Sequence, residues 1–299
     1  MLGEDIHDDK VKKLEKISND IRQDLIKALV NAGSGHSAGP LGMADVFTAL
    51  YFHVLKHDPK KPKMKNRDRL VVSCGHINPV IYSALANAGY FSRARFRKTL
   101  RKLGTLFQGH PHNLLTPGIE NSSGPLGQGL SQAIGMALAA KMNGERHQVF
   151  CIMSDGEQQE GQVWEAAMFA GKRKLDNLTA IMDRNNIQID GFTEDVMPLE
   201  PLRKKYEAFN WHVIDIDGHN IRQIVEACNE AYSIYEKPVL ILAHTVPGKG
   251  VEYMEFDYRW HGNPPGKGST ERSPEKEKQG AEALKELRTL GGKIKSEHE

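Results

Sequence analysis

The sequence predicts an α/β fold in which a mostly parallel sheet carries helices on both faces. Four short apolar runs, at residues 70–72, 149–153, 178–182 and 239–243, have the length of buried strands. The segments between the last three runs are long enough for crossover helices. Strands covered on both faces are apolar throughout, so these runs favour a parallel sheet over an antiparallel one.

Two helices are predicted before the first strand. In the first, apolar residues recur every three or four positions from Val11, at Leu14, Ile17, Ile21, Leu25 and Leu29. This spacing forms one face of an amphipathic helix, which should end at Gly33 and Gly35. A second helical pattern covers residues 46–55, and a basic, proline-containing turn separates it from the first strand.

The composition changes after Gly262, which suggests where the main domain ends. We expect a domain over residues 1–267 and a charged C-terminal tail over residues 268–299. Leu284, Leu287 and Leu290 have helical spacing in this tail. They predict a terminal helix that becomes ordered against a partner.

Charge and cysteine content narrow the possible functions. The 40 basic residues nearly balance 38 acidic ones, so a net charge of +2 gives no reason to expect nucleic acid or a membrane surface as partner. No apolar run approaches the length of a membrane span, and the first thirty residues lack a signal-peptide pattern. Cys74, Cys151 and Cys228 lie in or beside apolar stretches, which is typical of buried free thiols. We predict a soluble, cytoplasmic protein.

The motif with the clearest chemistry follows the second predicted strand. Residues 154–161 read Ser-Asp-Gly-Glu-Gln-Gln-Glu-Gly, and Asn185 follows the next strand. Carboxyl ends of neighbouring parallel strands meet at one edge of a sheet, where open α/β folds bind ligands. Asp155, Asn185 and a nearby backbone carbonyl are suitable ligands for Mg²⁺, or for Ca²⁺ or Mn²⁺, with diphosphate oxygens completing the shell.

Gly156 adds a reason to expect a phosphate group. A glycine lets the backbone approach a phosphate closely, and a helix starting near Gln159 would point its N-terminus at the negative charge. An isolated Asp-Gly pair is most often a turn without a ligand, so the other motifs must decide.

The complete set of motifs resembles the transketolase family. Asp155 and Asn185 lie 30 positions apart, as in the thiamine-diphosphate signature, although Ser154 replaces the glycine that the family usually has. The other matching segments are residues 34–43, 73–76, 109–111, 117–129 and 260–262. They appear in family order, so the resemblance covers most of the chain and implies thiamine diphosphate and Mg²⁺ as cofactors.

The resemblance also implies roles for individual residues. The matching segments contain four histidines, and each adjoins a glycine in a predicted loop. A single histidine in such a position is often only a surface or capping residue. His76 and His261 would contact the diphosphate, whereas His36 and His110 would face the sugar. The remaining predicted contacts are Gly124 and Leu126 to the aminopyrimidine, Ile189 to the thiazolium and the Ile187 carbonyl to the metal.

Glu160 and the length of the chain both indicate a second protein subunit. In the family, the glutamate of this Gln-Glu-Gly motif lies at a subunit interface and relays towards the catalytic glutamate of the partner. A complete transketolase is roughly twice as long as this chain. We therefore expect an N-terminal subunit of a split transketolase, which dimerises and forms an α2β2 assembly with a complementary C-terminal subunit.

Transfer of a glycolaldehyde unit between sugar phosphates is the expected reaction, and three alternatives stay open. Deoxyxylulose-phosphate synthesis uses a related scaffold but begins with pyruvate. A 2-oxoacid dehydrogenase component should lack this set of histidines. The third alternative is a cofactor-binding assembly protein without turnover, against which the intact Asp155, Asn185 and four histidines count.

Overall fold

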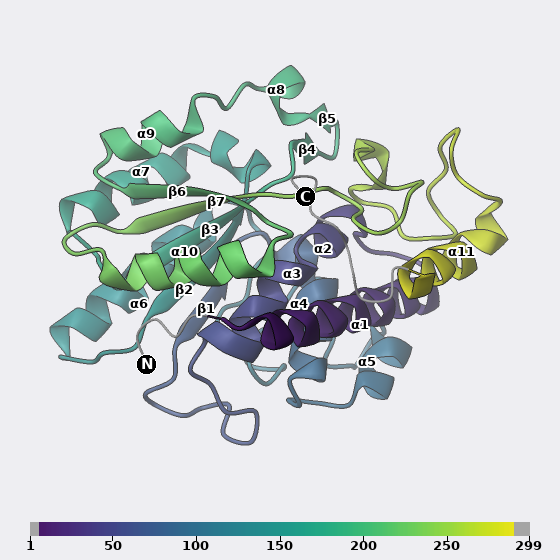
Figure 1. Cartoon of the computed structure of the whole chain (residues 1–299), viewed down its shortest axis with the longest axis horizontal. Coiled ribbons are helices and arrows are strands. Elements are labelled where there is room, and N and C mark those ends of the chain that lie inside the picture. Colours follow the sequence, from purple (N-terminus) through teal and green to yellow (C-terminus); the bar gives the residue numbers. More distant parts are fainter. Residues whose placement is uncertain (1–5, 290–299) are drawn as a thin grey trace.

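Five strands form one parallel sheet in the order β1-β2-β3-β7-β6 (Figure 1). The computed structural model describes residues 6–289. The strands are β1 (Arg69–Val72), β2 (Val149–Ser154), β3 (Leu178–Arg184), β6 (His212–Asp217) and β7 (Val239–His244). A separate two-stranded antiparallel hairpin, β4 (Ile187–Gln188) with β5 (Gly191–Phe192), follows β3.

Helices cover both faces of the sheet. They are α1 (Asp8–Ala32), α2 (Ala38–Gly42), α3 (Ala44–Ala49), α4 (Asn78–Asn87), α5 (Arg93–Thr99), α6 (Gln128–Met142), α7 (Gly161–Lys172), α8 (Thr193–Val196), α9 (Leu202–Ala208), α10 (Ile221–Ser233) and α11 (Lys276–Thr289). The short turns are η1 (Leu50–Val54), η2 (Gly75–Ile77), η3 (Gly156–Gln159) and η4 (Tyr258–Trp260).

Alternate side chains of each strand enter two different cores. Phe150 and Ile152 of β2 pack with α1, α3, α4 and α10, whereas Cys151 and Met153 pack with α6, α7 and α9. All six residues of β2 and all seven of β3 are buried. The sequence therefore contains continuous apolar runs because these central strands have no solvent-exposed face, and the predicted fold class is confirmed.

The predicted strands agree with the structure, and one strand was missed. All four apolar runs lie within β1, β2, β3 and β7. The missed strand, β6, is at the edge of the sheet and only partly buried, with polar Asp215 exposed in its centre. The polar residues Asp215 and Asp217 interrupt β6, whereas β1 at the other edge is buried along residues 70–72, so the apolar run that identified the other strands was absent from β6.

The two predicted N-terminal helices also form. Gly33 ends α1 in a left-handed conformation, with φ 63°, which a glycine adopts without strain. The second predicted helix is divided into α3 and the π-helical turn η1. Its end at Val54 is close to the predicted one.

The C-terminal helix α11 packs against α1 of the same chain, without a second protein. Figure 1 shows α11 beside α1, and Ala283 and Leu287 of α11 are fully buried in the core. Asn19 of α1 donates a hydrogen bond of 2.7 Å to the carbonyl of Leu287. The expected ordering against another protein was therefore wrong for residues 276–289, and Leu290 lies outside the described residues.

Two further findings concern the cysteine thiols and membrane-spanning helices. Cys74, Cys151 and Cys228 are buried and free, as predicted. Among residues 6–289, no helix combines the length and the hydrophobicity needed to cross a membrane.

Candidate functional site

A cavity of about 360 Å³ lies at the carboxyl edge of the sheet. It is where the loops after β1, β2 and β3 meet, as parallel strands require. The residues that line it are His36, His76, His110, Gly124, Leu126, Ser154, Gly156, Glu157, Gln159, Glu160, Asn185, Ile187, Gln188, Ile189 and His261. All the predicted site residues except Asp155 are in this set, and Asp155 lies directly between the lining residues Ser154 and Gly156.

Three of the four predicted histidines form a compact cluster. The ring centroids of His36 and His76 are 5.0 Å apart, those of His76 and His261 5.1 Å, and those of His36 and His261 5.4 Å. These residues come from positions far apart in the sequence, so only folding brings the rings together. His110 lies on another wall of the cavity, close to Gly124, and is exposed.

Burial keeps these imidazoles neutral. It lowers the pKa of both His36 and His261 to about 4, and for His36 the neighbouring His261 adds to this shift. The pKa of His76 is lowered well below its usual value, again mainly by burial. A neutral imidazole offers one N–H donor and one acceptor nitrogen at neutral pH, so the cluster can exchange protons with a polar ligand.

Two of these rings have an unused buried nitrogen. Nδ1 of His36 and Nδ1 of His261 are buried and have no hydrogen-bond partner among the described residues. A buried polar atom without a partner is unfavourable, and a bound ligand with suitable oxygens would satisfy both. This supports the cavity as a binding site for a polar molecule.

Asp155 and Asn185 follow adjacent parallel strands, as predicted. Ser154 and Asp183 are partners in the β2–β3 register, which places the two loops side by side. Asp155 is fully buried and accepts hydrogen bonds from the backbone N–H groups of Gly156 and Asn186, both at 2.7 Å. Its second oxygen also lies 3.1 Å from the guanidinium of Arg184.

These groups fit a hard divalent cation. Among residues 6–289, Oδ1 of Asp155 has one donor and therefore a free lone pair, and the Asn185 amide oxygen accepts only from the N–H of Ile187. Asp183 supports this arrangement by accepting a hydrogen bond of 2.8 Å from the Asn185 amide. Burial raises the pKa of Asp155 to about 6 and that of Asp183 to about 7, because it disfavours the charged carboxylates. A bound cation would act in the opposite direction and favour their ionised forms.

The predicted pyrimidine loop forms another part of the cavity wall. Gly124 and Leu126 precede Gly127, which has φ 80° and directly precedes α6. Gln162 of α7 donates a hydrogen bond of 3.2 Å to the Leu126 carbonyl, which fixes this loop against the region of Glu160. A methyl group at Gly127 would come within 2.9 Å of the Glu160 Cβ, so the two loops are in close contact.

The remaining predicted residues differ in exposure, and Glu160 and Ile189 lie at the mouth of the cavity. Glu160 is exposed and directly precedes α7, which starts slightly later than predicted because the turn η3 extends to Gln159. Ile187 is buried, whereas the Ile189 side chain is 63% exposed and therefore is not an ordinary core residue. An exposed apolar side chain beside a polar cavity suits contact with a ligand or a second protein chain.

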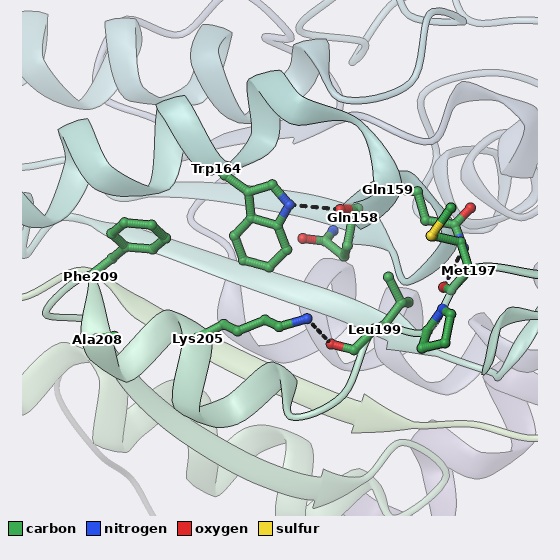
Figure 2. Close-up of a pocket in the computed structure, with 9 residues that line it drawn as sticks. Gln158, Gln159, Trp164, Met197, Leu199, Lys205, Ala208 and Phe209 are labelled. Atoms are coloured by element: carbon green, nitrogen blue, oxygen red, sulfur yellow. Dashed lines mark hydrogen bonds between the residues drawn. The ribbon is translucent and has the colours of Figure 1, made fainter.

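A larger groove of about 510 Å³ lies nearby, and its polar groups are already satisfied (Figure 2). The indole N–H of Trp164 donates to the Gln158 carbonyl at 2.9 Å, and the Lys205 ammonium donates to the Leu199 carbonyl at 2.6 Å. The side chain of Gln159 donates to the Met197 carbonyl and accepts from Gln188. We therefore assign the functional site to the histidine cavity, where polar atoms remain unused.

The sequence patterns missed two charged residues at the site. The Arg101 guanidinium lies against the backbone of Gly109, and its charge adds to the burial that lowers the pKa of His110 and His36. Glu157 is fully buried in the wall of the cavity. No motif marks Arg101, and Glu157 could not be distinguished from an exposed carboxylate because burial is not visible in a single sequence.

Comparisons with known proteins identify the family of the chain. Residues 14–288 match the family model described as transketolase, thiamine diphosphate binding domain. The chain is 46% identical over 242 residues to a 6-deoxy-6-sulfo-D-fructose transketolase subunit of Clostridium sp. (strain MSTE9), which covers 81% of this chain and 88% of that protein. It is 42% identical over 252 residues to one of the apulose-4-phosphate transketolase subunits of Phocaeicola vulgatus, covering 84% and 89%.

Longer relatives match over part of their length. Human transketolase is 36% identical over 262 residues, which cover 85% of this chain but 40% of the human protein. A crystal structure of transketolase from Campylobacter jejuni superposes with a TM-score of 0.84 at 36% identity, covering 93% of this chain and 42% of that one. The chain therefore spans about two fifths of these longer proteins and nearly nine tenths of the separate subunits.

Proposed function

Because the chain belongs to the transketolase family and matches its thiamine-diphosphate-binding domain, we propose that it is the diphosphate-binding subunit of a split transketolase. The reaction is transfer of a two-carbon ketol unit from a ketose to an aldose that carries an anionic end group. The observation that carries the proposal is the cluster of His36, His76 and His261 beside Asp155 and Asn185.

In this proposal, the residues around Asp155 hold the diphosphate end of the cofactor. Asp155, Asn185 and the Ile187 carbonyl ligate Mg²⁺, and His76 and His261 donate to diphosphate oxygens. The unused Nδ1 atom of His261 supports that role. When bound, thiamine diphosphate supplies the carbon to which the ketol unit is attached during transfer.

The sugar end of the site is assigned to His36, His110 and Arg101. His36 has a lowered pKa and is neutral at pH 7, so it can donate or accept a proton at a sugar oxygen. His110 is more exposed and lies closer to the entrance. The Arg101 cation beside them suits a phosphate or a sulfonate on the substrate, and the two relatives named as subunits carry the names of a sulfosugar and a sugar phosphate.

The aminopyrimidine is expected to lie between this chain and a partner. Gly124 and Leu126 contact it from this side, Ile189 contacts the thiazolium, and Glu160 relays to a glutamate of the complementary subunit. The exposure of Glu160 and Ile189 at the mouth supports a partner surface there. The relatives named as subunits support a separate complementary subunit, because the chain covers most of each of them but two fifths of the longer transketolases, and in this proposal the two subunits form an α2β2 assembly.

The test is a ketol-transfer assay on this chain alone and after mixing with the candidate complementary subunit encoded next to it. Thiamine diphosphate and Mg²⁺ are present throughout, and donors with phosphate and sulfonate end groups are compared. We expect activity only in the mixture. Full activity of the chain alone contradicts the split enzyme, whereas turnover of pyruvate instead of a ketose indicates deoxyxylulose-phosphate synthesis. Cofactor binding without any transfer indicates an assembly role.

A further inference from the structure

Glu157 is a buried carboxylate to which the proposed function gives no role. It lies in the turn η3, is 0% exposed and forms part of the wall of the histidine cavity. Burial raises its pKa. Burying a carboxylate costs free energy unless hydrogen bonds or opposite charges compensate, so the groups around Glu157 are informative.

Four neutral groups donate hydrogen bonds to this carboxylate. Oε1 accepts from the Ser73 hydroxyl at 2.5 Å and from the Gly127 N–H at 3.3 Å. Oε2 accepts from the N–H of Ser154 at 3.0 Å and from its hydroxyl at 3.2 Å. Both oxygens are therefore fully used, and the side chain has one well-defined position.

These donors belong to three loops that carry predicted cofactor contacts. Ser73 follows β1 and precedes His76, Ser154 ends β2 directly before Asp155, and Gly127 directly follows Leu126. The contact between the first and third loops is close. The Ser73 hydroxyl also accepts from the N–H of Gly129 at 3.0 Å, and a methyl group at Gly129 would come within 2.5 Å of the Ser73 Cα.

We propose that Glu157 is a positioning residue, which sets the distance between the diphosphate side and the pyrimidine side of the cofactor site. One side chain joins the loop of Leu126 to the loops of His76 and Asp155, so it holds both ends of the site in register before the cofactor binds. A site held in its bound arrangement loses less conformational freedom on binding. This inference rests on the proposed function and adds a determinant of cofactor affinity to it.

Glutamine is the sharpest substitution because it keeps the size of the side chain. Its amide group has only one acceptor oxygen, so its NH₂ must face one of the two donor pairs. Serine hydroxyls can rotate and accept, but the N–H of Gly127 or of Ser154 then has no acceptor. One of the two loops is therefore released whichever way the amide is oriented.

The experiment compares the wild-type chain, Glu157→Gln and the control Glu226→Gln, each mixed with the complementary subunit. Glu226 is exposed on α10 and does not line the histidine cavity. Ketol transfer gives kcat and the apparent KM for thiamine diphosphate at saturating Mg²⁺. Calorimetric titration of the same samples gives cofactor affinity independently of turnover, and thermal unfolding without cofactor reports stability.

We expect Glu157→Gln to raise the KM and Kd for thiamine diphosphate at least tenfold, with kcat at saturating cofactor within threefold of the wild type. A merely structural role would lower the unfolding midpoint and leave both constants unchanged. Constants within twofold of the wild type overturn the inference. If Glu157→Gln does not fold, Ser73→Ala takes its place, with an expected rise of at least threefold and the same overturning result.

The two proposals fail in different ways. An inactive wild-type mixture that still binds thiamine diphosphate contradicts ketol transfer, and calorimetry then still decides the role of Glu157. An active wild-type mixture with unchanged cofactor affinity in Glu157→Gln, or in Ser73→Ala where it takes its place, contradicts the positioning role alone.

Discussion

The imidazole rings of His36 and His261 meet edge to face, with their centroids 5.4 Å apart and their planes at 83°. The two residues are separated by most of the sequence, and each has a buried Nδ1 atom without a partner among the described residues. Two rings this close cannot both be protonated without strong repulsion in a buried site. The pair therefore favours the neutral state.

Acidification is expected to destabilise the chain through this pair. Both pKa values fall from 6.5 to about 4 on folding, so between these values the unfolded chain binds more protons. Stability therefore rises with pH in this window and is fully present above about pH 6.5. Each histidine changes the free energy of unfolding by up to roughly 1.4 kcal/mol per pH unit.

Denaturant unfolding between pH 4.5 and 7.5 measures this effect. The double variant His36→Asn/His261→Asn cannot protonate at these positions, so its stability should depend less steeply on pH than that of the wild type. Parallel curves for the two proteins would contradict the assignment of neutral, buried rings.

Asp155→Asn should remove magnesium-dependent cofactor binding while the fold is kept. The substitution preserves volume, and Arg184 keeps its ion pairs with Glu194 and Glu200. Loss of a charged metal ligand should weaken thiamine diphosphate binding at least about 100-fold. Titration by intrinsic fluorescence at several Mg²⁺ concentrations measures this, with exposed Asp9→Asn as the control. Unchanged binding would refute the metal assignment.

His110→Ala should separate binding from turnover. His110 lies at the entrance rather than beside Asp155, so thiamine diphosphate affinity should stay at the wild-type level. Loss of a proton-exchanging group at the sugar should lower kcat by about 100-fold. Steady-state kinetics of the mixed subunits provide the measurement, and exposed His244→Ala serves as the matched control. Equal kinetics of both variants would exclude His110 from the site.

Arg101→Gln should affect charged sugars selectively. The guanidinium lies beside His110 and Gly109, where an anionic end group would gain a charge-assisted hydrogen bond. We expect the KM for phosphorylated or sulfonated donors to rise about tenfold, which corresponds to ~1.4 kcal/mol, and the KM for uncharged donors to stay constant. An equal rise for both kinds of donor would point to distortion of the loop instead.

Replacement by alanine should change the free energy of unfolding in opposite directions at two glycines, one before α6 and one within it. Gly127 has φ 80°, and an added methyl group would lie 2.9 Å from the Glu160 Cβ, so Gly127→Ala should lower the free energy of unfolding by about 1–3 kcal/mol. Gly135 lies within the helix with open space around it, so Gly135→Ala should raise stability by about 0.5–1 kcal/mol. Denaturant unfolding of the purified chain compares them, and a destabilising Gly135→Ala would contradict the open space.

Several features of the fold followed from sequence patterns because they depend on local periodicity. The apolar runs identified β1, β2, β3 and β7, which are buried on both faces. The partly buried strand β6 has no such apolar run, so the sequence did not predict it. The packing of α11 on α1 was also missed, because helical spacing shows which face is apolar but not which surface covers it.

The sequence by itself determined most of the residues that gather at the histidine cavity, apart from Arg101 and Glu157. Asp155, Asn185 and the four histidines adjoin glycines or strand ends, where short-range patterns are specific, and the topology of a parallel sheet brings strand ends to one edge. Only the tertiary structure decided how they interact. The neutrality of His36 and His261, the contact of Arg184 with Asp155 and the four donors around Glu157 all depend on burial and on distances between loops far apart in the sequence. Burial and through-space distance have no periodic signature, so no pattern in a single chain records them.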